Sequence, residues 1–381
     1  MKTVVIAAYV RSPFTLAYKG ALAKVRPDEL AAQVVKGLLS KTGVNPELIE
    51  DLILGCAFPE GEQGFNLARL VTFLADLPRT VAGTTVNRFC GSSMQSIHMA
   101  AGAIQLNAGE AFICAGVESM SRVPMTGFNP MPHPELYKNY PQAYMGMGDT
   151  AENLAEKYQI SREQQDSFAV ESHKKAASAR DSGYFKDEII AIDTGHGMVE
   201  EDGCIRPETD MIILAGLKPA FNQQGSVTAG TSSPLTDGAS ATLVCSEDFA
   251  RRHNLDILVK IKSIAVSGCL PEIMGIGPVE STNKALQRAG LKIEDMDVIE
   301  LNEAFSSQSL AVLHDLKPDL NIVNIDGGAI ALGHPLGATG ARITGKAASL
   351  LNRVEGKYAL ATQCIGGGQG IATVLERVQG V

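Results

Sequence analysis

One order of sequence patterns occurs twice along this chain of 381 residues. Each half contains an apolar strand-like segment, then a Val-Asn pair, a glycine-bearing turn, a helix-like segment and a second apolar strand. The first strand-like segment is residues 49–58 in the first half and 293–305 in the second. The Val-Asn pairs are 86–87 and 323–324, and the second strands are 111–115 and 358–362. Because a repeated pattern indicates a repeated supersecondary structure, this order favours a duplicated α/β unit.

A stretch of different composition separates the two halves. It begins with a Met-, Pro- and Gly-rich segment at residues 120–148, which has no clean periodicity and is typical of ordered loop. Ser161 and Gln164 then form a capping-box pattern, which predicts a helix that ends at Gly183. An insertion of this length is usually functional. We expect a first half at residues 1–117, an inserted loop domain with a return to the first half at 118–248, and a second half at 249–381.

The composition restricts the class of protein. A net charge of −9 argues against a broad nucleic-acid surface, which needs clustered Lys and Arg. No stretch approaches the ~20 apolar residues of a membrane span. The short apolar run at residues 4–10 favours a buried first strand over the core of a secretion signal. Seven cysteines without a Cys-x-x-Cys pair argue against a disulfide framework or a metal site and favour a reducing compartment, for which we expect the cytoplasm.

Cys90 is the first candidate for a catalytic side chain. Residues 81–86 have strand character, and from Gly91 onward apolar residues recur at helical spacing. Cys90 should therefore lie at a helix N-terminus, where free N–H groups and the helix dipole favour a thiolate and can hold an oxyanion. The cysteines without such a context are predicted to be structural: Cys56, Cys114, Cys204, Cys245 and Cys269.

His334 and Cys364 occupy two further glycine-rich turns. His334 precedes a proline and lies among glycines at residues 327–340, which makes it a candidate general base. Cys364 follows an apolar strand and precedes three consecutive glycines, so its thiol should lie at a strand end beside open backbone. Two thiols and an imidazole in such turns indicate covalent acyl chemistry with a separate proton carrier.

Three other interpretations of these glycine-rich turns compete with covalent acyl chemistry. Residues 340–346 nearly match a phosphate-binding loop, but Ala347 replaces the Ser or Thr that would hold magnesium. A cysteine hydrolase is the competitor from another class, since Cys, His and Asn302 all occur, although Ser93-Met94 differs from the papain pattern. Glycine turns that serve packing alone would leave three reactive side chains in three such turns unexplained.

Four ordered motifs resemble those of the thiolase family: residues 86–94, 302–305, 327–340 and 364–370. The resemblance extends over essentially the whole chain. It implies an α/β thiolase fold, in which two similar halves each hold a five-stranded mixed sheet between helices and an inserted loop domain is added. It also implies coenzyme A thioesters as substrates, coenzyme A as co-substrate, no permanently bound cofactor and no metal.

The resemblance assigns a role to each candidate residue. Cys90 would attack a 3-ketoacyl-CoA and form an acyl-enzyme, and His334 would take the thiol proton and later activate coenzyme A. Cys364 would protonate the departing acetyl-CoA enolate. Asn302 would hold a water that stabilises one oxyanion with His334, and the N–H groups of Cys90 and Gly366 would stabilise the other. The reaction is the cleavage of 3-ketoacyl-CoA to acetyl-CoA and a shortened acyl-CoA in fatty-acid β-oxidation, with the Claisen condensation as its reverse.

The same resemblance suggests residues that contact the coenzyme or the acyl chain. Ser233 would contact the pantetheine arm and Arg206 would lie near the adenine, while Met145 and Met274 would line the acyl pocket and Phe305 would lie beside it. The alternatives are a turn hydroxyl for Ser233, a surface salt bridge for Arg206 and core packing for the two methionines.

The subtype and the partners are further expectations from the resemblance. Residues 88–95 and 206–209 look like the degradative 3-ketoacyl-CoA thiolases. Biosynthetic acetoacetyl-CoA thiolases carry His in a Tyr-His-Met-Gly stretch, where this chain has Ala143-Tyr144-Met145-Gly146 and so lacks the His. A biosynthetic acetyl-CoA acetyltransferase is the alternative. The segment at residues 120–144 is shorter than in tetrameric relatives, which favours a homodimer over a tetramer. Degradative bacterial thiolases can also pair with a multifunctional β-oxidation subunit.

Overall fold

A computed structural model describes residues 2–378 of the chain, and it contains the repeated unit that the sequence predicts. The first half contributes β1 (Val4–Arg11), β2 (Thr15–Leu16), α1 (Pro27–Thr42), β3 (Asp51–Gly55), α2 (Leu67–Leu74), β4 (Ala82–Val86), α3 (Ser92–Gln105), β5 (Ala111–Ser119) and β8 (Thr236–Ser246). The second half contributes α8 (Glu247–Arg252), β9 (Val259–Gly268), α9 (Gly277–Ala289), β10 (Val298–Leu301), α10 (Ser306–Leu316), α11 (Ala329–Leu332), α12 (Leu336–Arg353), β11 (Tyr358–Ile365) and β12 (Gln369–Glu376). The predicted domain ends at residues 1 and 381 lie outside the described residues.

The strand pairing repeats between the two halves. In the first half β1 pairs with β8 and β8 with β5 in antiparallel ladders, and β5–β3 and β3–β4 are parallel. In the second half β9–β12 and β12–β11 are antiparallel and β11–β10 is parallel. This shared order of strands confirms the duplicated α/β fold class.

The sheets differ in two details from the predicted pair of five-stranded sheets. In the second half the strand that would match β4 is reduced to one bridge between Ile299 and Val323, because Val323 directly follows a short 3-10 helix. The two halves also form one continuous sheet in the described residues, in the order β10-β11-β12-β9-β1-β8-β5-β3-β4. The junction between β1 and β9 consists of two residue pairs, Val5–Lys260 and Ile6–Val259.

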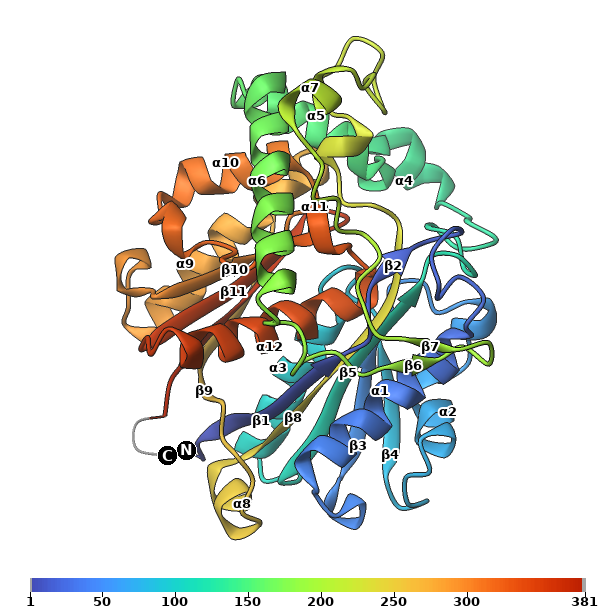
Figure 1. The fold of residues 1–381 in the computed structure, drawn as a ribbon, viewed down its shortest axis with the longest axis vertical. Helices are drawn as coiled ribbons and strands as arrows, with labels where there is room; N and C mark the ends of the chain where they lie inside the picture. The colour runs from blue at the N-terminus through green and yellow to red at the C-terminus, as the bar shows by residue number, and fades with distance from the viewer. Residues whose placement is uncertain (1, 379–381) are drawn as a thin grey trace.

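Helices α3 and α12 pack together at the centre of the molecule (Figure 1). Their apolar side chains share one core with strands of both halves, while α1 and α2 cover the other face of the first half and α9 and α10 that of the second. Gly340 permits the close approach, because a Cβ there would lie 2.3 Å from the backbone nitrogen of Met94. The N-termini of α3 and α12 follow the turns that carry Cys90 and His334.

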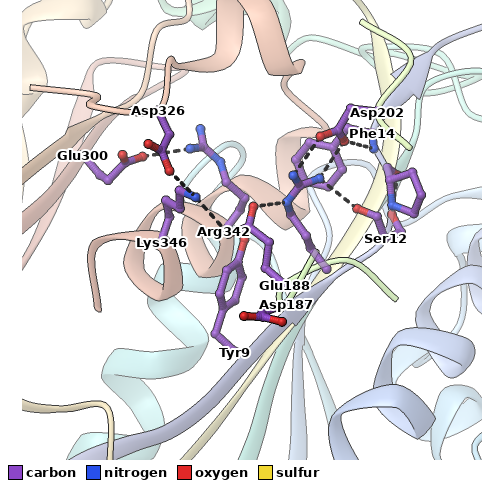
Figure 2. Close-up of polar contacts among 12 residues, drawn as sticks. Tyr9, Ser12, Phe14, Asp187, Glu188, Asp202, Glu300, Asp326, Arg342 and Lys346 are labelled. Atoms are coloured by element: carbon purple, nitrogen blue, oxygen red, sulfur yellow. Dashed lines mark hydrogen bonds and ion pairs between the residues drawn. The ribbon is translucent and has the colours of Figure 1, made fainter. Parts of the chain in front are cut away.

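Buried ion pairs fix α12 to its neighbours (Figure 2). Arg342 pairs with Glu300 of β10 at 2.9 Å, and Lys346 pairs with Glu188 of the insertion at 3.1 Å. Glu188 also accepts from Arg11 of β1 at 2.8 Å. Removing one partner of a buried pair typically costs about 3–5 kcal/mol. This network therefore holds the insertion, the first strand and the central helix in one arrangement.

The helices of the insertion gather at one end of the molecule, whereas the small two-stranded sheet of the insertion lies beside α1 (Figure 1). Its elements are α4 (Pro134–Asn139), α5 (Met147–Lys157), α6 (Arg162–Asp181), β6 (Ile192–Asp193), β7 (Met198–Val199) and α7 (Met211–Ala215). The capping box of Ser161 and Gln164 is present at the start of α6, and Gly183, with φ of +76°, follows its end as predicted. None of the helices between residues 2 and 378 is long and apolar enough to cross a bilayer.

Candidate active site

Cys90 lies in the turn between β4 and α3. Phe89 adopts a left-handed backbone with φ of +43°, and the side chain of Asn87 accepts the Phe89 N–H at 2.8 Å, which stabilises the turn. Gly91 allows close packing, because a Cβ there would lie 2.5 Å from the Ile365 side chain. The glycine therefore lets the end of β11, which carries Cys364, approach the Cys90 turn.

Cys364 and Gly366 meet Cys90 at the hairpin between β11 and β12. Gly367 and Gly368 both have positive φ, near +80°, and form the tight turn after Cys364. The Gly366 N–H is hydrogen-bonded to the Cys90 thiol, and Gln363 donates to the Cys90 carbonyl. Cys364 is buried, whereas Cys90 is partly exposed. The structure thus brings together the two predicted cysteines and the predicted oxyanion donor.

His334 lies in the turn between α11 and α12, where Gly333 has φ of +100°. Its Nδ1 is 2.6 Å from the Thr339 hydroxyl, which itself donates to the Pro335 carbonyl at 3.0 Å. Because that hydroxyl hydrogen is used, Thr339 accepts from Nδ1–H, and this assigns the proton to Nδ1. The unprotonated Nε2 lies 3.4 Å from the Asn302 amide nitrogen. The arrangement leaves Nε2 free to accept a proton.

Burial shifts the pKa values of all three reactive side chains of the site, Cys90, His334 and Cys364. Burial raises the pKa of the Cys90 thiol to about 11, against the opposing N–H groups of Gly366 and of Cys90 itself. The N–H groups favour the thiolate, as expected, but burial outweighs them. Burial, followed by the positive charge of Arg342, lowers the pKa of His334 to about 3, so its imidazole is neutral at pH 7. Burial, followed by Cys90, also raises the pKa of Cys364 well above its usual range.

The predicted pocket residues separate into two groups. Met274 and Phe305 pack in one apolar cluster with Cys364, and the Ser233 N–H donates to the carbonyl of Ala304 in the same region at 3.0 Å. Met145 lies outside that cluster, where its sulfur accepts from the Asn153 amide at 3.4 Å.

Arg206 is exposed, on a loop of the insertion. Its N–H donates to Nδ1 of His173 at 3.2 Å, so the buried face of α6 fixes the backbone from which the guanidinium extends. An exposed arginine in this position is free to meet an anion approaching from solvent.

Two side chains of the site were missed by the sequence reasoning. Met147 packs against the cluster of Cys364, and its sulfur would lie 3.4 Å from a Cβ at Gly366. The only signal was its place in the run Met-Gly-Met-Gly at residues 145–148. Thr339, which fixes the His334 tautomer, lies inside the motif at residues 327–340, but the motif alone assigned it no role.

Comparison with known proteins gives a consistent result. The model of the thiolase N-terminal domain matches residues 4–248, and that of the thiolase C-terminal domain matches residues 255–377. The chain is 47% identical to a 3-ketoacyl-CoA thiolase of Bacillus subtilis (strain 168) and 50% identical to one of Shewanella sp. (strain MR-7). Both alignments cover 99% of this chain and 100% of the relative.

Solved structures with the same fold come from both thiolase types. Human mitochondrial 3-ketoacyl-CoA thiolase has a TM-score of 0.92 at 39% identity, with 99% of each chain covered. The Bacillus anthracis acetyl-CoA acetyltransferase has the same TM-score, identity and coverage. Three findings agree: two family models span nearly all of residues 4–377, full-length relatives are near 50% identical, and the fold is duplicated. The chain therefore belongs to the thiolase family.

Proposed function

We propose that the chain is a 3-ketoacyl-CoA thiolase, an acyltransferase that cleaves 3-ketoacyl-CoA with coenzyme A in β-oxidation. The observation that carries the proposal is the meeting of two thiols with different surroundings, Cys90 beside the Gly366 N–H and Cys364 in an apolar cluster. Full-length relatives with this name support it. A cysteine hydrolase would need one thiol, whereas carbon–carbon cleavage needs a nucleophile and a separate proton donor.

The first half-reaction begins at Cys90. His334 Nε2 takes the thiol proton as the sulfur attacks the 3-keto carbonyl, and the oxyanion that forms lies at the N–H groups of Cys90 and Gly366. The bond between C2 and C3 of the substrate then breaks, leaving an acyl group on Cys90. Cys364 gives its proton to the acetyl-CoA enolate, whose oxygen is stabilised by His334 and a water held by Asn302.

The second half-reaction returns both cysteines to thiols. Coenzyme A binds in place of acetyl-CoA, and Cys364, left as a thiolate when it protonated the enolate, takes the coenzyme A thiol proton. The coenzyme A sulfur attacks the acyl carbon and expels Cys90, which recovers its proton from His334. A neutral imidazole suits the role of His334, because the low pKa of about 3 keeps it unprotonated before the reaction.

The coenzyme and the acyl chain would reach these groups from the side of the insertion. We assign the acyl pocket to Met274, Phe305 and Met147, which surround Cys364, and place Met145 at its rim. Ser233 is assigned to the pantetheine arm and Arg206 to the adenine end. A solved human mitochondrial 3-ketoacyl-CoA thiolase in complex with CoA, 39% identical to this chain, supports coenzyme A as the co-substrate.

The deciding experiment is the thiolysis rate as a function of 3-ketoacyl-CoA chain length, from four carbons upward. A degradative enzyme should retain activity on longer chains, whereas a sharp fall beyond four carbons would favour the biosynthetic acetyl-CoA acetyltransferase, a reading supported by the fold shared with the Bacillus anthracis enzyme. Turnover of a simple amide or peptide without coenzyme A would instead support a hydrolase.

We also propose that the enzyme is a homodimer that joins at β4. This strand ends the sheet, its outer edge has no strand partner in the described chain, and α2 beside it exposes Leu70 and Phe73. An unpaired strand edge favours pairing with a second copy. Light scattering should give a dimer mass, and a monomer or tetramer would contradict this. Pairing with a multifunctional β-oxidation subunit stays a prediction from the resemblance.

The domain division and the compartment complete the proposal. We divide the chain at residues 117/118 and 248/249, since β8 returns the insertion to the first sheet immediately before the second half begins. Seven cysteines, all free, suit a reducing compartment, and we place the enzyme in the cytoplasm.

A further inference from the structure

Glu118 is a buried carboxylate at the end of β5, 1% exposed, that lies outside the four sequence motifs. It accepts five donors: Ala57 N–H at 2.8 Å, Gly337 N–H at 2.9 Å, the Gln63 amide at 2.8 Å, Phe58 N–H at 3.2 Å and the Cys56 thiol at 3.7 Å. Because these partners are all donors, they suit the ionised, acceptor-only form of the carboxyl. Burial raises the pKa of Glu118, and these donors, which favour its ionised form, oppose that rise.

One side of this carboxylate leads to the Cys90 turn. The loop at residues 56–58, which donates to Glu118, is itself bonded to that turn, since the Asn87 amide donates to the Ala57 carbonyl at 2.9 Å. Ala57 and Phe58 share an apolar cluster with Cys90, and the ring of Phe58 lies 5.8 Å from that of Phe89. A shift of this loop would therefore move the backbone that carries the Cys90 thiol.

The other side leads to His334. Gly337 N–H belongs to the first turn of α12, whose N-cap residue Pro335 offers no side-chain acceptor, so Glu118 accepts one of the free N–H groups at the helix start. Gly337 allows this approach, because a Cβ there would lie 2.5 Å from the Val117 carbonyl oxygen. The carboxylate thus holds the helix that begins two residues after His334.

We propose that Glu118 is a positioning residue for acyl transfer: one carboxylate binds both the loop at residues 56–58, which supports the Cys90 turn, and the start of α12, which follows His334. It acts through those turns and contacts neither substrate nor reacting atom. This inference rests on the proposed function of Cys90 and His334 as nucleophile and base.

The charge of Glu118 has a second consequence at the Cys90 thiol. The groups that face this sulfur are the backbone N–H groups of Gly366 and Cys90, Cys364 from β11 and, from β5, the carboxylate of Glu118. Burial is the main cause of the raised pKa of Cys90, the N–H groups of Gly366 and Cys90 oppose it, and the carboxylate of Glu118 adds a smaller rise. Glu118 therefore adds to the preference of Cys90 for the protonated thiol.

The test uses Glu118→Gln in the full-length enzyme. The amide NH2 would face the N–H groups that the carboxylate accepts, so the two turns should separate, and kcat for thiolysis should fall about 10²-fold with little change in KM. Iodoacetamide labelling of Cys90, measured against pH by intact mass, should move to lower pH because the negative charge is gone. A purely structural defect would slow turnover without that shift.

Two further variants make the result decisive. Glu118→Asp keeps the charge, so its labelling should retain the pH dependence of the wild type even where kcat falls. Asp237→Asn removes a buried carboxylate on the adjacent strand that binds Ser119 and Ser121, and its labelling should also be unchanged. The proposal is overturned if folded Glu118→Gln keeps kcat within twofold of wild type, or if its labelling curve stays in place or moves to higher pH.

If Glu118→Gln fails to fold, the Glu118→Asp variant decides. Its side chain is shorter and cannot span the same donors, so an unchanged kcat would overturn the positioning role. Iodoacetamide labelling needs no substrate. Failure of the wild type to thiolyse any 3-ketoacyl-CoA would therefore reject the proposed function while leaving the labelling result readable.

Discussion

The first half of the chain carries Glu118 near the end of β5, and the second half carries Cys364 near the end of the corresponding strand β11. Glu118 pairs with Gly238 in the antiparallel ladder of β5 and β8, and Cys364 pairs with Gly370 in the ladder of β11 and β12. The turns before the central helices repeat the pattern, since Cys90 and His334 each lie two residues before their helix begins. The duplicated frame therefore determines where reactive groups can lie, and divergence determines which groups they are.

The surroundings explain why the two strand-end positions have different tasks. Glu118 accepts five donors and cannot transfer a proton without losing several of them. Cys364 instead packs among Ala151, Met274 and Phe305, where its thiol can turn toward a substrate. Saturation with hydrogen bonds makes a side chain a fixed support, whereas apolar packing around a thiol leaves its proton available.

The largest loss of activity is expected from replacing Cys90, in the turn before α3 of the first half. Cys90→Ser should lower thiolysis by on the order of 10⁴-fold or more, because a hydroxyl is far less acidic and less nucleophilic than a thiol. Intact mass after incubation with an acyl-CoA should show no stable acyl adduct. Cys269→Ser, at the other partly exposed thiol, is the control and should keep both activity and adduct. Robust thiolysis by the Cys90 variant would contradict the assignment.

Replacing Cys364, near the end of β11 in the second half, should give a smaller loss of activity that affects only the proton-transfer step. Cys364→Ala should still form the acyl-enzyme, since Cys90, Gly366 and His334 remain, but it should lose exchange of the acetyl-CoA α-protons with D2O by about 10²–10⁴-fold. NMR of acetyl-CoA measures the exchange. Persistent exchange would assign the proton transfer to another group and remove the contrast between Cys364 and Glu118.

The sequence predicted the frame and the reactive residues, because both have local signatures. Glycine-rich turns, a strand before Cys90 and the order of elements are visible in short segments, and the structure brings Cys90 to Cys364 and Asn302 to His334. The capping box of α6 was equally local. These features depend on neighbours within a few residues, which a sequence displays directly.

Features that depend on distant contacts could not be predicted. Burial raises the pKa of Cys90, and part of that burial comes from the turn at Gly366, which is 276 residues away in the sequence. The helix N-terminus alone suggested a lowered pKa. Glu118 looks like an ordinary strand-end residue until five donors from two other segments surround it. The junction between the sheets consists of two residue pairs, too few to leave a pattern.

Buried histidines offer a test that separates folding from catalysis in the two halves. His98 on α3 and His334 before α12 both have a pKa lowered to about 3 by burial, followed by Arg88 or Arg342. The unfolded chain binds these protons near pH 6.5, so folding stability falls as pH decreases below 6.5 and continues to fall toward pH 3.

At pH 5 each histidine should cost up to about 2 kcal/mol relative to pH 7. Urea unfolding at both pH values should show that His98→Gln and His334→Gln each reduce this acid loss. Only His334→Gln should abolish thiolysis, since the ring of His98 contacts Thr373 in the core. Equal loss of activity in both variants would indicate that the measured defect is one of folding.

The smallest effect is expected outside the repeated unit, at the start of α6. Ser161→Ala removes the side-chain acceptor for the Gln164 N–H, at 3.1 Å, and should lower the free energy of unfolding by about 1 kcal/mol. Because Ser161 lies several turns away from Ser172 and His173, through which α6 binds Glu303 and the Arg206 loop, kcat should stay within about twofold of wild type. Ser182→Ala, at the other end of the same helix, is the matched control and should change stability less, since its role in the C-cap is played by its backbone N–H. A large fall in kcat from Ser161→Ala alone would mean that the insertion takes part in catalysis rather than covering the site, and the comparison of the two halves would then have to include it.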